Sequence, residues 1–233
     1  MSNTNLNRRT FLTMAAAAGA GYASWKWLRT RARDGGLEWP LRNMLEANES
    51  IAEAYFSKAR LSPSFRPSDL TRARINGRLG LQSPLDLDAW RLKIEGVASL
   101  AMDEIRALPR HEQITELRCI EGWSIIVKWT GARLADLVAK YPPRELTKFV
   151  ALETPDRGYY VGLDIESALH PQTLLAYEMN GSPLAALHGA PLRLAIPVKY
   201  GIKNIKRIGT LRYTNIRPAD FWAERGYDWY AGH

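Results

Sequence analysis

The sequence predicts a single α+β domain in which strands outnumber helices. Short runs of alternating apolar and polar residues, typical of half-buried strands, recur from Trp90 to the end of the chain. Asn180-Gly181 lies between two such runs, and this dipeptide strongly favours a tight hairpin. The helical segments are few and short, so a regular βαβ alternation is not predicted. With 233 residues, 46% of them hydrophobic, the chain can form one substantial core.

The spacing of apolar residues predicts each element in turn. Helical periodicity covers residues 41–58, and the proline-rich stretch 61–68 is an extended connection. Two further short helices are expected over 99–108, beginning at a serine cap, and over 134–141. Strands are expected over 90–96, 114–120, 148–153, 159–163, 174–179, 192–197 and 207–213.

The first 33 residues have the features of an export signal. Asn7-Arg8-Arg9-Thr10-Phe11-Leu12 is similar to the twin-arginine consensus, and fifteen residues without a charge run from Phe11 to Trp25. That length suits the apolar region of a signal peptide and is short for a membrane span. The alternative is a basic, amphipathic N-terminus. We therefore expect residues 1–33 to direct twin-arginine export to the periplasm, and residues 34–233 to form the functional domain.

Charge and cysteine usage exclude several classes of function. The net charge is +8, of which residues 1–33 carry +6, so the other 200 residues carry only +2. A basic face for nucleic acid on the folded domain is therefore not expected. The chain has one cysteine, which excludes an intramolecular disulfide, a zinc site built on two or more cysteines, and covalently attached c-type haem.

The single cysteine, Cys119, is the first candidate for chemistry. It ends a predicted strand between Arg118 and Glu121, and Gly122 marks a turn directly after it. A lone cysteine is commonly a buried, inert side chain, and that alternative stays open. Charged neighbours and a turn instead favour an accessible thiolate, whose pKa Arg118 could lower.

A second candidate is the stretch from Met179 to Ala219, which holds seven cations and no acid. Glycines and prolines between the cations predict turns, where exposed backbone amides together with Lys and Arg can bind a phosphate or pyrophosphate. His188, just before Gly189, could place an imidazole at the rim of such a pocket. A solvated basic surface is the alternative. The chain lacks GxGxxG, GxxxxGK[ST] and GxSxG, so Rossmann, P-loop and hydrolase sites are not indicated.

Taken together, these motifs resemble the molybdopterin-dependent oxidoreductases of the sulfite oxidase superfamily. The most similar members are the exported bacterial catalytic subunits that include the periplasmic methionine-sulfoxide reductases. The combination of Cys-x-Glu-Gly-Trp with His-Gly-Ala-Pro-x-Arg, about 70 residues apart, is fairly specific. The stretches that carry the resemblance are 118–124 with 129–131, 153–154, 180–184, 188–193 with 197–206, and 222–229.

The resemblance implies a mixed, β-rich molybdopterin domain and a molybdenum–molybdopterin cofactor. It places Cys119 at the family's molybdenum-ligating, catalytic cysteine, and a soft thiolate suits that metal. The positions that match cofactor contacts in the family are Asn48, Ile51, Ala52, Thr154, His188, Arg193, Asn204, Ile205 and Lys206.

The resemblance also implies a two-electron oxygen-atom transfer on a small substrate, with an S-oxide as one candidate. Electrons would be exchanged with an external partner such as a membrane or periplasmic cytochrome, and we expect a monomer. Glu121-Gly122-Trp123 stands where true sulfite oxidases have an arginine-rich sequence, so sulfite is not the expected substrate. Two alternatives remain: a non-enzymatic exported module that binds an anion, and a cysteine-based peroxidase or thiol reductase, for which a second, resolving cysteine is absent.

Overall fold

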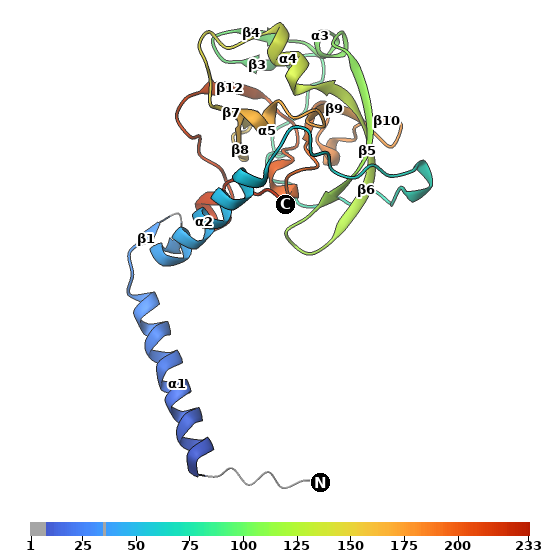
Figure 1. Cartoon of the computed structure of the whole chain (residues 1–233). Coiled ribbons are helices and arrows are strands. Elements are labelled where there is room, and N and C mark those ends of the chain that lie inside the picture. Colours follow the sequence, from blue (N-terminus) through green and yellow to red (C-terminus); the bar gives the residue numbers. More distant parts are fainter. Residues whose placement is uncertain (1–7, 35) are drawn as a thin grey trace.

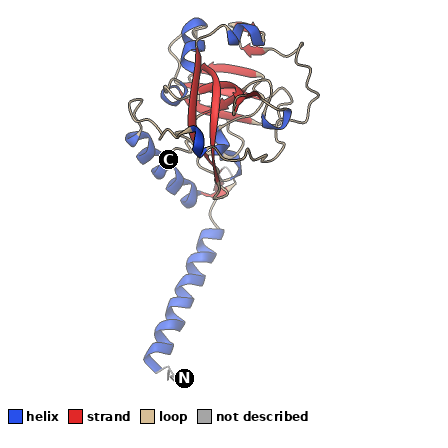
Figure 2. Ribbon diagram, turned by 90° about the vertical axis from the view of Figure 1, so that its right-hand side faces the viewer, coloured by secondary structure: helices blue, strands red, loops and turns tan. Residues whose placement is uncertain are grey.

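The computed structural model describes residues 8–34 and 36–233. Helix α1 (Arg8–Arg29) projects away from a body of strands and short helices, and none of its residues is buried (Figures 1 and 2). The expected signal segment therefore corresponds largely to this helix, although Asn7 of the twin-arginine motif lies outside the described residues. No helix in the described part of the chain combines the length and hydropathy needed to span a bilayer.

Most strands of the body belong to two sheets. The first has the order β10 (Ser182–Pro183), β9 (Leu174–Met179), β6 (Ser124–Arg133), β5 (Arg110–Arg118), and β11 (Arg193–Ala195) also pairs with β9. The second has the order β4 (Ala98–Leu100), β3 (Leu92–Ile94), β12 (Thr210–Thr214), β7 (Phe149–Glu153), β8 (Tyr160–Asp164). Only β12 and β3 run parallel among these pairs, which is the mixed topology of an α+β domain.

The helices of the body lie around the sheets, and apart from one of 17 residues they are short (Figure 1). Residues Arg33–Asp34 (β1) and Leu37–Glu38 (β2) form a small antiparallel pair between α1 and the body. The α-helices that follow are α2 (Trp39–Tyr55), α3 (Met102–Arg106), α4 (Leu134–Lys140) and α5 (Ile165–Ala168). Single 3-10 turns are η1 (Pro67–Asp69), η2 (Ala186–His188), η3 (Gly201–Lys203) and η4 (Ala223–Arg225).

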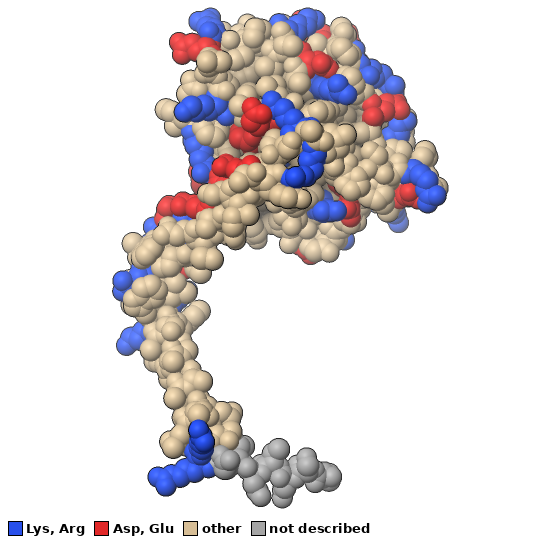
Figure 3. All heavy atoms as spheres, in the orientation of Figure 1, with Lys and Arg blue, Asp and Glu red and all other residues tan. Residues whose placement is uncertain are grey.

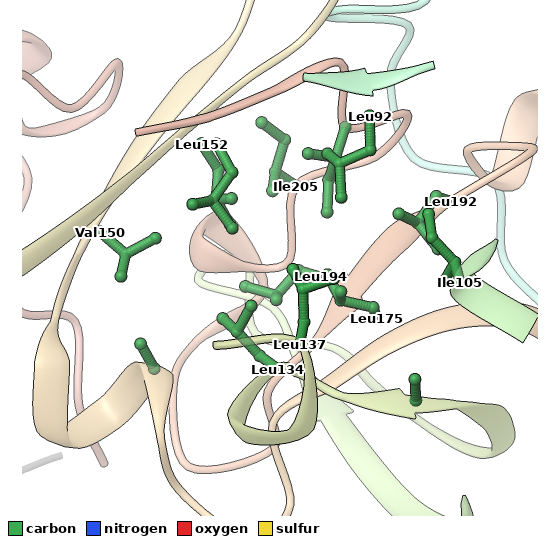
Figure 4. Packing of buried hydrophobic residues seen from close by; sticks show 14 of the residues in the cluster. Leu92, Ile105, Leu134, Leu137, Val150, Leu152, Leu175, Leu192, Leu194 and Ile205 are labelled. Atoms are coloured by element: carbon green, nitrogen blue, oxygen red, sulfur yellow. The ribbon is translucent and has the colours of Figure 1, made fainter. Parts of the chain in front are cut away.

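The main hydrophobic core lies between the two sheets. Leu175 and Leu194 enter it from the first sheet, and Val150 and Leu152 enter it from the second (Figure 4). Ile205, one of the predicted cofactor residues, is fully buried in the same cluster. The loop that carries Ile205 is therefore anchored in the core, which fixes the position of the loop residues beside it.

The predicted elements are largely present, and the differences have local causes. The hairpin at Asn180-Gly181 forms with φ of 52° and 80°, the positive values that a type I′ turn requires. Where one helix was expected over 99–108, β4 forms first, and the backbone N–H of Ala101 donates to the carboxylate of Glu104, which caps α3 in place of a serine.

Strand β6 was not predicted, although it spans ten residues. Its register against β9 shifts between Thr130 and Gly131, so its pattern is interrupted. Gly131 lies so close to β9 that a Cβ there would stand 2.1 Å from the carbonyl oxygen of Leu175. The glycine is therefore needed for the close approach of the two strands.

Candidate active site

A cavity of about 250 Å³ opens where β5 ends, and Cys119 is part of its wall. Most of this wall comes from four segments that are distant in the sequence: the turn after β5, residues 74–79, the loops from His188 to Lys206, and the C-terminal segment. The lining includes Arg74, Asn76, Gly77, Leu79, Cys119, Glu121, Trp123, Trp129, Tyr159, His188, Arg193, Gly201, Asn204, Lys206, Trp222 and Tyr227.

A tight turn presents Cys119 to the cavity. The backbone N–H of Cys119 donates to the carbonyl of Trp123 (2.9 Å), and the N–H of Gly122 donates to the carbonyl of Cys119 (3.1 Å). Gly122 has a φ of 86°, a conformation that favours glycine. The thiol is half-buried, and the side-chain nitrogen of Asn76 lies 3.7 Å from its Sγ atom.

The electrostatic surroundings of Cys119 differ from the sequence expectation. Burial raises the pKa of the thiol, and among nearby cations Arg74 acts to lower it. Arg118 is engaged elsewhere: its Nε donates to Glu116 at 2.7 Å, and its terminal nitrogen lies 3.2 Å from His233. The expectation that Arg118 acts on the thiol is therefore replaced by a role for Arg74, which stacks over the Trp123 ring at 4.6 Å.

Arg193 places a buried positive charge in the cavity wall. Its side chain donates to the carbonyls of His188 (2.9 Å) and Asn204 (3.3 Å), and its guanidinium lies 4.7 Å from the centre of the Trp129 ring. Burial lowers the pKa of Arg193 to about 10. Within the described residues its hydrogen-bond acceptors are neutral carbonyls and it forms no ion pair. A bound anion would offset the cost of burying this charge.

Lys206 and His188 add to the positive potential of the same wall. The Nζ atom of Lys206 donates to the carbonyls of Asn76 (2.5 Å) and Gly77 (3.3 Å). Burial and then the nearby charge of Arg193 lower the pKa of Lys206 to about 8. Burial, Arg193 and Lys206 likewise lower the pKa of His188. The charge of Arg193 thus disfavours the charged forms of Lys206 and His188, and an anion between the three side chains would stabilise their charged forms.

Four of the other five cations of the 179–219 stretch have acidic partners from elsewhere in the chain, and the fifth, Arg207, donates to the backbone carbonyls of Ala190 and Ser83. Lys203 is buried, and its Nζ atom lies 2.6 Å from the carboxylate of Asp220. Lys199 is also buried, and its Nζ atom lies 3.6 Å from the carboxylate of Asp164. Arg212 lies 3.5 Å from Glu95, and Arg217 pairs with Glu49. The interpretation of the whole stretch as an anion site was therefore too broad, and of its seven cations Arg193 and Lys206 line the cavity.

Asn204 shapes the loop that closes the cavity. Its side-chain oxygen accepts from the N–H of Ile196 (2.9 Å), and its side-chain nitrogen donates to the carbonyl of Tyr200 (3.2 Å). At Gly201 the loop comes so close to β5 that a Cβ would lie 3.2 Å from the carbonyl oxygen of Arg118. Tyr159 donates to the carbonyl of Ile202 (2.5 Å) and holds the loop from the other side. The loop and the cysteine turn are thus fixed against each other.

Five predicted residues do not line the cavity. Asn48 and Ile51 are exposed on α2, and Ala52 packs on the cluster that contains Trp229 and Tyr230. The structure therefore does not bring the α2 residues to Cys119, because α2 packs against the C-terminal segment. Of the other two, Ile205 lies in the core. Thr154 is buried, donates to Asp156 (2.7 Å) and accepts from the N–H of Tyr159 (3.1 Å).

The N-terminal part of the wall comes instead from residues 74–79, which sequence reasoning missed. Asn76 contributes its carbonyl to Lys206 and its side chain to Cys119. Asn76-Gly77 is itself a turn signal within a stretch that has no helical or strand periodicity. That signal could have predicted an ordered turn in this segment, but it could not have predicted that the turn lies beside Cys119.

The low pKa of Lys206 predicts a pH-dependent stability. The folded wild type loses this proton at a lower pH than the unfolded chain, so its free energy of unfolding should rise between pH 8 and 10.5. Lys206→Met lacks this proton, so the difference in free energy of unfolding between the two proteins should shift in favour of the wild type over this range, by an amount on the order of 1 kcal/mol after allowance for solvent screening. Urea unfolding across this range measures it, and a pH-independent difference would contradict the assignment.

The fold and the cavity define a class of protein: an α+β domain that places one thiol and a positively charged wall in the same cavity. The chain belongs to the family described as the oxidoreductase molybdopterin binding domain, whose model matches residues 80–222. The α+β class is thereby confirmed, as is the expected molybdopterin cofactor.

Two proteins similar in sequence to this chain are named as methionine-sulfoxide reductase subunits. The chain is 34% identical over 206 residues to a putative protein-methionine-sulfoxide reductase subunit, YedZ1, of Azospira oryzae, covering 85% of this chain and 78% of that protein. It is 38% identical over 157 residues to the protein-methionine-sulfoxide reductase catalytic subunit MsrP of Xanthomonas campestris pv. campestris, covering 59% of this chain and 49% of that protein. The chain thus matches about half the length of MsrP.

Among solved structures, the sulfane dehydrogenase SoxCD from Paracoccus pantotrophus has a similar fold. The TM-score is 0.54 at 18% sequence identity, with 70% of this chain and 50% of that chain covered. At this identity the likeness concerns the arrangement of the strands and helices.

Proposed function

We propose that this protein is a molybdenum-dependent reductase of S-oxides, and that Cys119 is the metal ligand. The observation that carries the proposal is the placement of a half-buried thiol and an uncompensated buried arginine, Arg193, in the wall of one cavity. The relatives whose names specify methionine-sulfoxide reductase support the substrate class. Reduction of a sulfoxide consumes two electrons and two protons and releases a thioether and water.

The residues of the cavity fit a molybdenum–molybdopterin cofactor. In the described residues, no group of three or more His, Cys, Asp or Glu side chains could hold a metal, so a metal at Cys119 would take its other ligands from the cofactor. A thiolate is a soft donor suited to such a metal. Arg193 and Lys206 would bind the pterin phosphate through charge-assisted hydrogen bonds.

When bound, the cofactor supplies the two-electron redox centre, and the chain supplies its surroundings. The Asn204 hydrogen bonds and the close contact at Gly201 fix the loop of residues 196–206 against the Cys119 turn. The side chains of Trp123, Trp222 and Tyr227 form an apolar part of the wall. These aromatic rings suit the carbon substituents of a sulfoxide and limit access of water to the reacting atoms.

The proposal is tested by turnover of the molybdenum-loaded protein. Reduced dye should be reoxidised when methionine sulfoxide or a small dialkyl sulfoxide is added, whereas sulfite should not reduce the oxidised dye. Activity towards sulfite alone would exclude the proposed substrate class. The comparisons give no support to the non-enzymatic anion-binding alternative, and the family membership replaces the metal-free thiol reductase with a molybdopterin enzyme.

Electron supply and location complete the proposal. A reductase without a second redox group needs an external donor, and a membrane or periplasmic cytochrome would serve. The names of the relatives identify them as subunits, which is in keeping with a partner protein. Twin-arginine export to the periplasm stays a prediction based on Arg8 and Arg9, which are exposed at the start of α1.

The export prediction has a direct test. Exchange of the arginine pair for lysines (Arg8→Lys with Arg9→Lys) should retain the protein in the cytoplasm, because recognition depends on the guanidinium pair and not on charge alone. Fractionation of cells that express either form measures the outcome. Lys26→Arg, at the far end of α1, is the matched control and should leave export unchanged. Equal periplasmic amounts of wild type and the double variant would contradict a twin-arginine signal.

A further inference from the structure

Helix α2 exposes a stripe of apolar residues, although charged residues of the same helix are buried. Its buried residues are Arg42 and Glu49, both charged. Its outward side exposes Met44, Ile51 and Tyr55 to 61%, 69% and 66%. A surface helix ordinarily turns its apolar stripe to the core, so this outward stripe calls for a different apolar neighbour.

The buried charges of α2 fix this orientation. The Arg42 side chain donates to the carbonyls of Ala223 (2.8 Å) and Tyr227 (3.3 Å), and Glu49 pairs with Arg217. Rolling the helix to bury its apolar stripe would break these contacts and leave charged groups without partners, which is unfavourable. The outward position of Met44, Ile51 and Tyr55 is therefore a stable property of the fold.

Helix α1 extends the apolar surface beyond the body. It exposes Phe11, Leu12, Trp25 and Trp27, each by more than half of its surface, and Trp39 at the start of α2 is 43% exposed. The space-filling view shows long uncharged stretches along both helices, with cations at the far end of α1 and near its junction with α2, and acids where α2 meets the body (Figure 3). We call this surface, α1 together with Met44, Ile51 and Tyr55, the apolar arm.

The charges of the arm favour one kind of neighbour. Residues 8–33 hold six cations and no acid, although Arg29 and Arg33 each lie 3.8 Å from Glu38. Tryptophans beside arginines are typical of segments at a membrane interface, where the rings sit at headgroup level and the cations meet phosphates. Such charge complementarity points to lipid rather than to a second copy of this chain, whose arm would carry the same positive charge.

We propose that the apolar arm binds the surface of a bilayer that contains anionic lipid, with α1 and the outward face of α2 in the interface. The catalytic body would then be held close to the membrane, provided that residues 1–33 stay attached to it after export. The inference is independent of the reaction assigned to Cys119, because none of the arm residues lines the cavity.

The test is binding of the full chain to lipid vesicles, followed by flotation. Vesicles of phosphatidylcholine with phosphatidylglycerol should bind the wild type, and salt should weaken the binding. The double variant Met44→Gln, Ile51→Gln keeps α1 intact, and its partition coefficient should fall at least about tenfold, because two apolar side chains leave the interface. Leu146→Gln with Ile216→Gln is the matched control, since these residues are 96% and 81% exposed on the body.

Three outcomes would overturn the proposal. These are failure of the wild type to bind the vesicles, equal binding of the wild type and the α2 variant, and lipid-free dimers of the wild type that the α2 variant does not form. The last result would assign the face to a second copy. Thermal unfolding of each variant checks that it folds, and Met44→Ala with Ile51→Ala, which preserves helix propensity, provides a second variant for the same comparison.

Discussion

Cys119→Ser should leave the fold intact and remove turnover. The change in volume is small and the side chain is only half-buried, so the unfolding transition should stay close to that of the wild type. A hydroxyl is a harder, weaker ligand than a thiolate for the proposed metal. Activity should fall by more than the roughly 100-fold that loss of an outer-shell partner costs. Steady-state dye assays and the visible spectrum of the loaded protein measure both effects.

The control for this variant is a similarly small change outside the cavity. Ser99→Ala, on an exposed position of β4, should keep full activity and the wild-type spectrum. Molybdenum content has to be determined in each preparation, because cofactor held through the pterin alone can remain in Cys119→Ser. Wild-type turnover by fully loaded Cys119→Ser would remove Cys119 from its proposed role.

Arg193→Met should deplete the protein of cofactor. The substitution keeps an apolar contact with Trp129 but removes the buried guanidinium that we assign to the pterin phosphate. A hydrogen bond to a charged group is worth about 1.5–3 kcal/mol, so occupancy at limiting cofactor should fall about tenfold or more. Lys206→Met should have an effect of the same direction. Molybdenum and released pterin, both measured per chain, give the occupancy.

Lys58→Met is the matched control for the two cations. Lys58 forms a solvent-exposed ion pair with Glu166 (2.8 Å), and such pairs contribute little. The cofactor content of the Lys58→Met variant should equal that of the wild type. If Arg193→Met, Lys206→Met and Lys58→Met all retained full occupancy, the positive wall of the cavity would not be the phosphate site.

The fold could be predicted from the sequence where a pattern is local. Strand β9 begins and ends as its apolar run predicts, and the Asn180-Gly181 turn follows from backbone conformations that these residues favour. Strand β6 was missed although Ile125, Val127 and Trp129 alternate in it. The bulge that interrupts its pattern depends on contact with β9, and that contact is not visible in the sequence of β6 alone.

The site shows the same division between local and long-range information. Cys119 and Arg193 were found because each stands in a recognisable motif. Which cations face the cavity depends on acids that the fold brings in from elsewhere, such as Asp164 beside Lys199. Residues 74–79 have no periodicity to mark them, and their place beside the cavity is shown by the contacts of Asn76 with Lys206 and Cys119. These contacts are tertiary, so residue spacing could not predict them.

The hydrogen bonds of Lys206 have a consequence for the order of assembly. An ammonium group has three N–H donors, and two are directed to the carbonyls of Asn76 and Gly77. The remaining donor can serve an anion while the other two continue to hold residues 74–79 in place. One side chain would then join the N-terminal wall, the loop of residues 196–206 and the cofactor. The wall can therefore form before the cofactor binds, and an anion on the third donor would stabilise it further, so residues 74–79 should resist proteases better in the loaded protein than in the cofactor-free chain.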